Sequence, residues 1–293
     1  MLFRSGKAVG QPVYELLCTE GAPQRQIKIY ASGGVEHAWY DGGEQALIEE
    51  ALRHQEAGYD AFKFRPGTDW QAAGMTLEKY APILERLRAA VGPHFRLMHE
   101  GLGMSLGSLE AIITDFAPLL EELGFYWFEE AFGGTSIEHI DLFIRLKEAL
   151  PTVRVSGGER FRERFEAQVW LDRQALDIVQ TDCNVTGVTE NWYIARMAQL
   201  RGISLIPHNW HGGGTTMANA HLVAAIANRE YCELNGTHNP LKEGIFKEPL
   251  TVQNGVMTLP DKPGFGVELI DDVEKRFPFQ PGSYQKPNVR VSR

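Results

Sequence analysis

Paired cysteines and long apolar runs are both scarce in this chain of 293 residues. Its three cysteines, Cys18, Cys183 and Cys232, show no paired spacing, which predicts a reducing, cytoplasmic setting rather than a disulfide framework. No apolar run approaches the roughly 20 residues of a membrane helix, and the N-terminus lacks the apolar core of a signal peptide. We therefore expect no membrane partner.

An excess of basic charge is also missing. The chain has 38 acidic and 29 basic residues and a net charge of −9. A nucleic-acid or anionic-membrane partner would need a basic face, so this balance argues against both. A small acidic substrate remains compatible with it, because a local cationic site can lie inside an acidic shell.

Short β-branched or aromatic runs alternate with helical patterns along most of the chain. The runs predict strands at residues 26–32, 61–65, 95–100, 126–129, 153–157, 177–182, 204–208 and 231–235. The clearest helical patterns between them are at residues 43–57, 77–91, 106–123, 137–150 and 186–200. Strands that begin about 25 to 35 residues apart are typical of strand–helix units in a parallel barrel. A doubly wound open sheet is the alternative, but the segment 31–35 after the first strand is not a nucleotide-binding fingerprint.

The two ends of the chain do not follow this alternation. Residues 1–25 contain one short helical pattern, at 13–18, and we expect them to be the end of a larger unit. Residues 26–239 form the predicted barrel. Residues 240–293 are rich in proline and glycine and predict a tail packed against it.

Three carboxylates fall at the ends of consecutive predicted strands. Glu100, Glu129 and Glu159 end strands three, four and five, and neighbouring strands lie about 5 Å apart. Like charges at that separation cannot all stay ionised without a counter-charge. All-oxygen ligands favour Mg²⁺, so we predict a magnesium site, the alternative being three solvated loop residues.

Cations and a possible acid/base pair occupy other strand ends. Lys63 and Arg65 are two residues apart and share a strand face, which suits an anionic substrate and a developing oxyanion. Both could instead be ordinary ion-pair partners of nearby carboxylates. Asp182 and His208 end neighbouring strands six and seven, an arrangement that favours an oriented, more basic imidazole.

Further polar residues lie beside these positions. Glu233 ends the predicted eighth strand and adds another ionisable group to the strand ends. The candidates for substrate contacts are His99, Glu130, Asn209 and His211, although the histidines could simply line the rim.

Taken in order, these segments resemble the enolase superfamily, in its mandelate racemase-like and acid-sugar dehydratase branch. The matching pieces are residues 63–65, 98–100, 127–130, 157–159, 177–182, 206–209 and 260–266. The resemblance implies a modified TIM barrel, (β/α)7β, in which residues 1–25 are the remnant of an α+β capping domain. Such proteins usually carry Lys-x-Lys on strand two, where this chain has Arg65 as the second cation.

The resemblance also implies roles for the polar residues. Glu100, Glu129 and Glu159 would hold Mg²⁺, and His208 with Asp182 would be the general acid/base. Glu233 would contact the substrate or its enediolate.

The predicted reaction is removal of the proton α to a carboxylate followed by loss of water. Arginine stays protonated at ordinary pH, so His208 is the one strong base, and a one-sided site favours elimination over racemisation. We therefore predict a dehydratase acting on a small sugar acid, an aldonate or aldarate, in a homo-oligomer.

Three alternatives remain open at the level of sequence. A racemase or epimerase of a 2-hydroxy acid would need Arg65 as a second base. A truncated, catalytically inert barrel is another. A serine hydrolase would use Ser105, which lies within a G-x-S-x-G pattern and precedes Asp182 and His208 in the hydrolase order.

Overall fold

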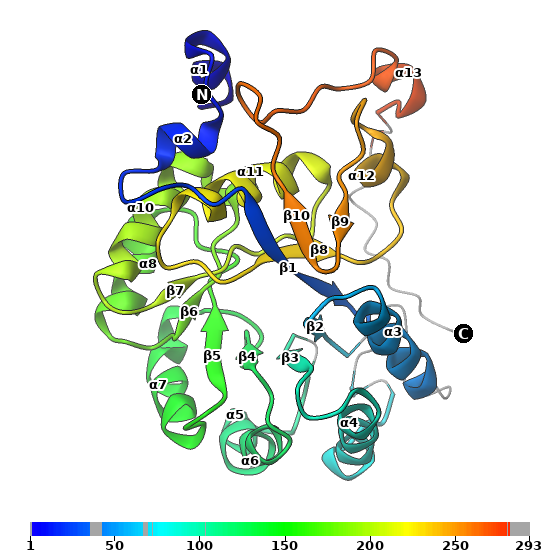
Figure 1. Cartoon of the computed structure of the whole chain (residues 1–293). Coiled ribbons are helices and arrows are strands. Elements are labelled where there is room, and N and C mark those ends of the chain that lie inside the picture. The colour runs from blue at the N-terminus through cyan, green and yellow to red at the C-terminus, as the bar shows by residue number, and fades with distance from the viewer. Residues whose placement is uncertain are drawn as a thin grey trace.

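A ring of parallel strands forms the centre of the chain in the computed structural model, which describes residues 2–35, 43–66, 70–71, 73–102, 104–279 and 281. The ring strands are β1 (Gln26–Gly33), β2 (Ala61–Phe64), β3 (Arg96–Glu100), β4 (Trp127–Glu129), β5 (Arg154–Gly157), β6 (Ile178–Val179), β7 (Ser204–Leu205) and β8 (Cys232–Asn235). Figure 1 shows them around the middle of the molecule with helices outside. The predicted parallel α/β barrel is confirmed.

Helices follow most of the strands, as the alternation predicts. They are α3 (Glu44–Glu56), α4 (Leu77–Val91), α5 (Leu109–Ala111), α6 (Ala117–Glu122), α7 (Ile140–Ala149), α8 (Arg164–Asp172), α9 (Cys183–Thr186), α10 (Val188–Gln199) and α11 (Gly213–Ala225). The predicted helix at 106–123 begins later and contains a π-helical turn at Ile112–Phe116. Pro118 lies one turn further on, where it removes one backbone donor from the regular α-helical ladder.

Strand pairing runs in sequence order from β7 to β1, and β8 pairs in parallel with the other side of β1. Among the described residues, no ladder joins β7 to β8. The ladders of β6 and β7 cover two residues each, fewer than predicted. Asp182 accepts a hydrogen bond from the Asn184 backbone N–H at 2.7 Å and caps α9. Asp182 follows the end of β6, and His208 follows the end of β7.

Alternation along each strand separates the interior of the barrel from the layer beneath the helices. The interior contains Tyr30, Ala61, Met98, Trp127, Ile178, Ile206 and Tyr231. The larger outer core packs the opposite strand faces against the helices, with Phe62, Phe64, Leu97 and Phe128 fully or almost fully buried. The barrel is therefore a packed core, and its open volume is confined to the strand ends.

The terminal segments pack against each other and against the barrel. The N-terminal segment contains two helices, α1 (Leu2–Val9) and α2 (Val13–Leu17), of which the sequence predicted only the second. The Val13 backbone N–H donates to the Gly264 carbonyl at 2.8 Å, so the start of α2 is bound to the tail.

The tail contains a hairpin that the sequence analysis missed. Strands β9 (Val252–Gln253) and β10 (Val256–Thr258) form it, and β10 pairs antiparallel with β1 from Gln26 to Lys28. Short helices flank the hairpin, α12 (Pro240–Gly244) and α13 (Val273–Arg276). No helix in the described part of the chain is both long and apolar enough to cross a membrane.

Candidate active site

A cavity of about 420 Å³ opens at the carboxyl ends of the barrel strands. Its lining comes from β2, β3 and the segments that follow β5, β6 and β7, and consists of Lys63, Arg65, Glu100, Glu159, Arg160, Arg162, Asp182, Val185, His208, Trp210 and His211. Most of these side chains are ionisable. Seven of them are residues that the sequence analysis selected as candidates, because parallel strands deliver their C-terminal residues to one edge.

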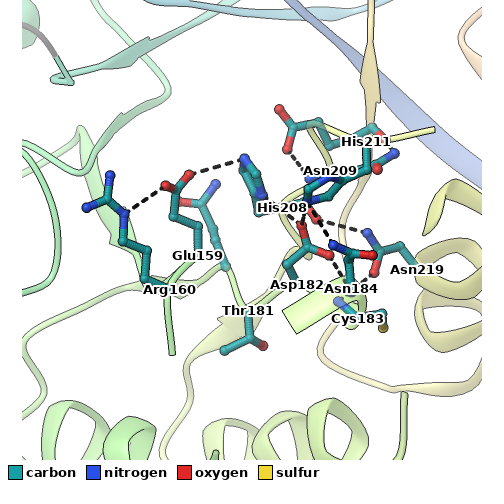
Figure 2. A network of polar contacts seen from close by, with 12 residues as sticks. Glu159, Arg160, Thr181, Asp182, Cys183, Asn184, His208, Asn209, His211 and Asn219 are labelled. Carbon is teal, nitrogen blue, oxygen red and sulfur yellow. Dashed lines mark hydrogen bonds and ion pairs between the residues drawn. The ribbon is translucent and has the colours of Figure 1, made fainter. Parts of the chain in front are cut away.

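The dyad of Asp182 and His208 is formed. His208 Nδ1 lies 2.9 Å from Oδ2 of the fully buried Asp182, and His208 Nε2 lies 3.1 Å from Glu159 Oε2 (Figure 2). Burial alone would lower the pKa of His208, but the charge of Glu233 and the Asp182 hydrogen bond outweigh it and raise that pKa to about 9. The imidazole is thus strongly basic and fixed in orientation.

Asn219 on α11 connects the two strand ends that carry the dyad. Its Nδ2 donates to the His208 carbonyl at 2.9 Å, and its Oδ1 accepts from the Cys183 N–H at 3.2 Å (Figure 2). The asparagine is fully buried. It therefore fixes the spacing between the ends of β6 and β7, and sequence reasoning gave no signal for it.

A buried cation lies across the floor of the cavity. Lys63 is ion-paired with Glu129 and, at 3.0 Å between Nζ and Oε1, with Glu233. Burial opposes the charged ammonium, yet Glu129 and Glu233 together raise the pKa of Lys63. Glu129 also accepts hydrogen bonds from Gln180 Nε2 at 2.6 Å and Trp127 Nε1 at 3.2 Å. Gln180 was missed, although its position two residues after inward-facing Ile178 could have indicated it.

Glu233 is charged despite complete burial. Burial raises its pKa, but the charges of Lys63 and His208 lower it further than that, to about 2. Oε2 accepts the Asn209 backbone N–H at 2.6 Å, while the Asn209 side chain donates to the Glu233 carbonyl at 3.0 Å and to Thr216 Oγ1 at 2.8 Å. Asn209 is fully buried, so it holds Glu233 in place. Asn209 does not line the cavity, and its contact with a substrate stays a prediction.

His99 and Glu130 likewise do not line the cavity. His99 is fully buried beneath α4 and packs edge-on against Phe64 and Phe116, with Nε2 2.8 Å from Tyr80 Oη. Glu130 is buried and its Oε1 accepts the Gly158 N–H at 2.7 Å. His99 precedes inward-facing Glu100, and successive side chains on a strand point to opposite faces. Glu130 instead follows the end of β4 in a left-handed backbone conformation, with φ of 48°, and the alternation of the strand does not extend to it.

The remaining candidate contact, His211, lines the cavity as predicted, with Nε2 3.2 Å from Asp182 Oδ2. Arg65 also lines it, over the ring of Trp210 at 5.6 Å and 3.8 Å from Glu100 Oε1. Arg160 and Arg162 add two cations that the sequence analysis did not select. Both arginines come within three residues of Glu159, and this position after the fifth strand could have indicated that they lie at the rim.

The hydrolase alternative finds no support in the geometry. Ser105 is exposed and does not line the cavity, and His208 Nε2 contacts Glu159 instead. Gly103 of the G-x-S-x-G pattern lies outside the described residues.

The three glutamates offer the oxygen donors that a divalent cation such as Mg²⁺ prefers, and they lie at the ends of consecutive strands. Glu100 and Glu129 are register neighbours on β3 and β4, and Glu159 follows β5. Burial raises the pKa of Glu100 to about 7, although the charge of Lys63 opposes that rise. A buried carboxylate whose negative charge is only partly balanced by nearby cations is suited to bind a metal ion.

The glutamate side chains nevertheless contact three different cations of the chain itself. Glu100 faces Arg65, Glu129 holds Lys63, and Glu159 contacts His208. Within the described ranges, the one trio of potential ligands whose atoms lie within 4.8 Å of one another is Asp182, His208 and His211. The magnesium site on the glutamates therefore stays a prediction.

Comparison with known proteins places these observations in a family. An arabinonate dehydratase from Saccharolobus solfataricus is 32% identical over 273 residues, which are 93% of this chain and 68% of that protein. A D-galactarolactone cycloisomerase from Agrobacterium fabrum is 29% identical over 93% of this chain and 70% of its own length.

Solved structures agree with this relationship. The 3,6-anhydro-D-galactonate cycloisomerase from Zobellia galactanivorans superposes with a TM-score of 0.80 at 29% identity, covering 94% of this chain and 72% of that one. Sugar-acid dehydratases recur among the named relatives, which confirms the prediction of an enzyme of the lyase class. The model of the family described as enolase C-terminal domain-like matches residues 46–273. The chain belongs to this family of the enolase superfamily, as the ordered strand-end residues predicted.

Proposed function

We propose that the chain is the barrel of a Mg²⁺-dependent sugar-acid dehydratase that converts an aldonate or aldarate to its 2-keto-3-deoxy product. The observation that carries the proposal is the Asp182–His208 dyad, whose imidazole lines the same cavity as Lys63 and Arg65. A base beside two cations suits removal of a proton α to a carboxylate. The dehydratases among the relatives support the choice of reaction.

The metal would be held by Glu100, Glu129 and Glu159. When bound, Mg²⁺ supplies positive charge that acidifies the hydrogen α to the substrate carboxylate. Of these, Glu129 also pairs with Lys63, and Glu159 also contacts His208.

The proton transfers are assigned to His208. Nε2 of the neutral imidazole takes the α proton, and Asp182 stabilises the imidazolium through Nδ1. The same Nε2–H then protonates the hydroxyl that leaves from the β carbon, so that water departs and the enol product becomes a 2-keto acid. Lys63 and Arg65 stay protonated and stabilise the negative charge that develops on the substrate.

Epimerisation of a 2-hydroxy acid is the second candidate. It is favoured by one observation, that Arg65 faces the same cavity as His208 and could act on the other face of a substrate.

The test incubates the purified chain with Mg²⁺ and a panel of aldonic and aldaric acids in D₂O, followed by proton NMR. We expect a new methylene at C3 that disappears with a chelator and in His208→Asn. The matched control is His238→Asn, an exposed histidine that pairs with Glu243 away from the cavity.

Exchange or inversion at the α carbon without the methylene would replace the dehydratase by the epimerase. If no acid in the panel reacts or exchanges its α hydrogen, even with a chain extended by a capping domain, the inert barrel would be favoured.

A further inference from the structure

We propose that Asp182, His208 and His211 form a second cation site, selective for a transition metal such as Zn²⁺, whose occupancy blocks the acid/base dyad. The site is distinct from the glutamates proposed to hold Mg²⁺, and it lies on the opposite side of His208 from Glu159. Its ligands come from the ends of β6 and β7.

The three ligand atoms already converge. Asp182 Oδ2 lies 2.9 Å from His208 Nδ1 and 3.2 Å from His211 Nε2, and the potential ligand atoms all fall within 4.8 Å of one another. One carboxylate oxygen therefore contacts both imidazoles. A divalent cation between these atoms would replace shared protons by three direct bonds.

The surroundings already provide the outer contacts that metal-binding histidines and carboxylates use. The Asn184 N–H binds Asp182 Oδ1 at 2.7 Å, which fixes the carboxylate and leaves Oδ2 directed at the two rings. On the far side of His208, Glu159 Oε2 lies 3.1 Å from Nε2. A carboxylate on the second ring nitrogen orients a metal-binding histidine and strengthens it as a donor.

The donor set selects the cation. Two imidazole nitrogens and one carboxylate suit Zn²⁺ and its neighbours in the first transition row, whereas Mg²⁺ prefers oxygen. Three protein ligands leave coordination positions open to water or to a ligand in the cavity. His211 is 39% exposed on the side chain, so the cation has a route in from that cavity.

A cation bound at this site would inactivate the dyad, because it takes the Nδ1 lone pair of His208 and the Asp182 oxygen that orients the imidazole. Zn²⁺ should therefore inhibit without displacing Mg²⁺. Binding itself does not depend on the proposed function, so the two can fail separately.

The test measures Zn²⁺ binding by isothermal titration calorimetry in a large excess of Mg²⁺, with no substrate, for the wild-type chain, His211→Gln and His238→Gln. His238 is the matched control, since its ring is 78% exposed and pairs with Glu243 in another part of the chain. We expect one tight site in the wild type and the control, and affinity weaker by at least about tenfold in His211→Gln. Visible absorption of bound Co²⁺ should report a nitrogen-containing site of low coordination number.

Equal affinity in His211→Gln and the wild type would overturn the proposal. So would progressive loss of Zn²⁺ as Mg²⁺ is raised, because that result assigns Zn²⁺ to the glutamates. A Co²⁺ spectrum typical of octahedral oxygen ligation would overturn it as well.

Discussion

Replacing Lys63 by methionine tests the electrostatic centre of the barrel. The change keeps most of the apolar stem but leaves Glu129 and Glu233 fully buried without their shared cation. At the 3.0 Å separation between Nζ and Glu233 Oε1, an effective dielectric constant of about 20 gives roughly 5 kcal/mol of attraction. Removing one partner of a buried pair typically costs about 3–5 kcal/mol, and we expect a loss in that range.

The loss should depend on pH in a defined direction. Burial already raises the pKa of Glu129 above the value of about 4.5 in the unfolded chain, and loss of the ammonium, which opposes that rise, raises it further. A group whose folded pKa is raised contributes stability below the unfolded pKa and loses it as pH rises through the folded pKa. Lys63→Met should therefore be less impaired near pH 5 than near pH 8.

Urea denaturation followed by circular dichroism at both pH values measures these free energies. The control is Lys28→Met, since Lys28 is 59% exposed and its pair with Asp60 should contribute less than about 1 kcal/mol. A deficit in Lys63→Met below about 1 kcal/mol, or one that is equal at the two pH values, would refute the reasoning.

Three further predictions concern the dyad and the terminal segments. Asp182→Asn should lower kcat for dehydration of the sugar acid by roughly 10²- to 10⁴-fold with an unchanged melting temperature, because the amide cannot stabilise the imidazolium of His208. An unchanged kcat would show that Asp182 takes no part in the proton transfers. In Mg²⁺, kcat/KM should rise with pH through an apparent pKa between 6.5 and about 9, that of His208, and a profile flat over this range would exclude it as the base. Buried His221 accepts the Tyr14 N–H, and burial lowers the pKa of His221 from 6.5 to about 4. As pH falls from 6.5 to about 4, the unfolded chain takes up a proton at this residue before the folded chain does. The free energy of unfolding should therefore fall by up to about 3 kcal/mol over that interval. Urea titrations should show this slope reduced in His221→Gln, and an equal slope would contradict it.

The strand-end pattern was readable from sequence because it depends on local rules. Parallel strands with a helix after each one must end at the same rim, so Lys63, Glu100 and His208 could be placed near one another without coordinates. The same rule of alternation, applied more strictly, would have moved His99 into the outer core, since it precedes inward-facing Glu100. The hairpin of β9 and β10 was not predictable in the same way, because its strands are two and three residues long and depend on pairing with β1.

The sequence by itself determined the barrel, the rim and the identity of most ionisable groups that meet there. Only the tertiary structure decided which charge neutralises which. Lys63 reaches Glu129 and Glu233 across the barrel interior, over 66 and 170 positions of sequence, and Asn219 on α11 joins the ends of β6 and β7. The physical reason is that alternation and strand length fix where each side chain points. The partner of a buried charge is fixed by the arrangement of the strands in the ring, which brings together residues far apart along the chain.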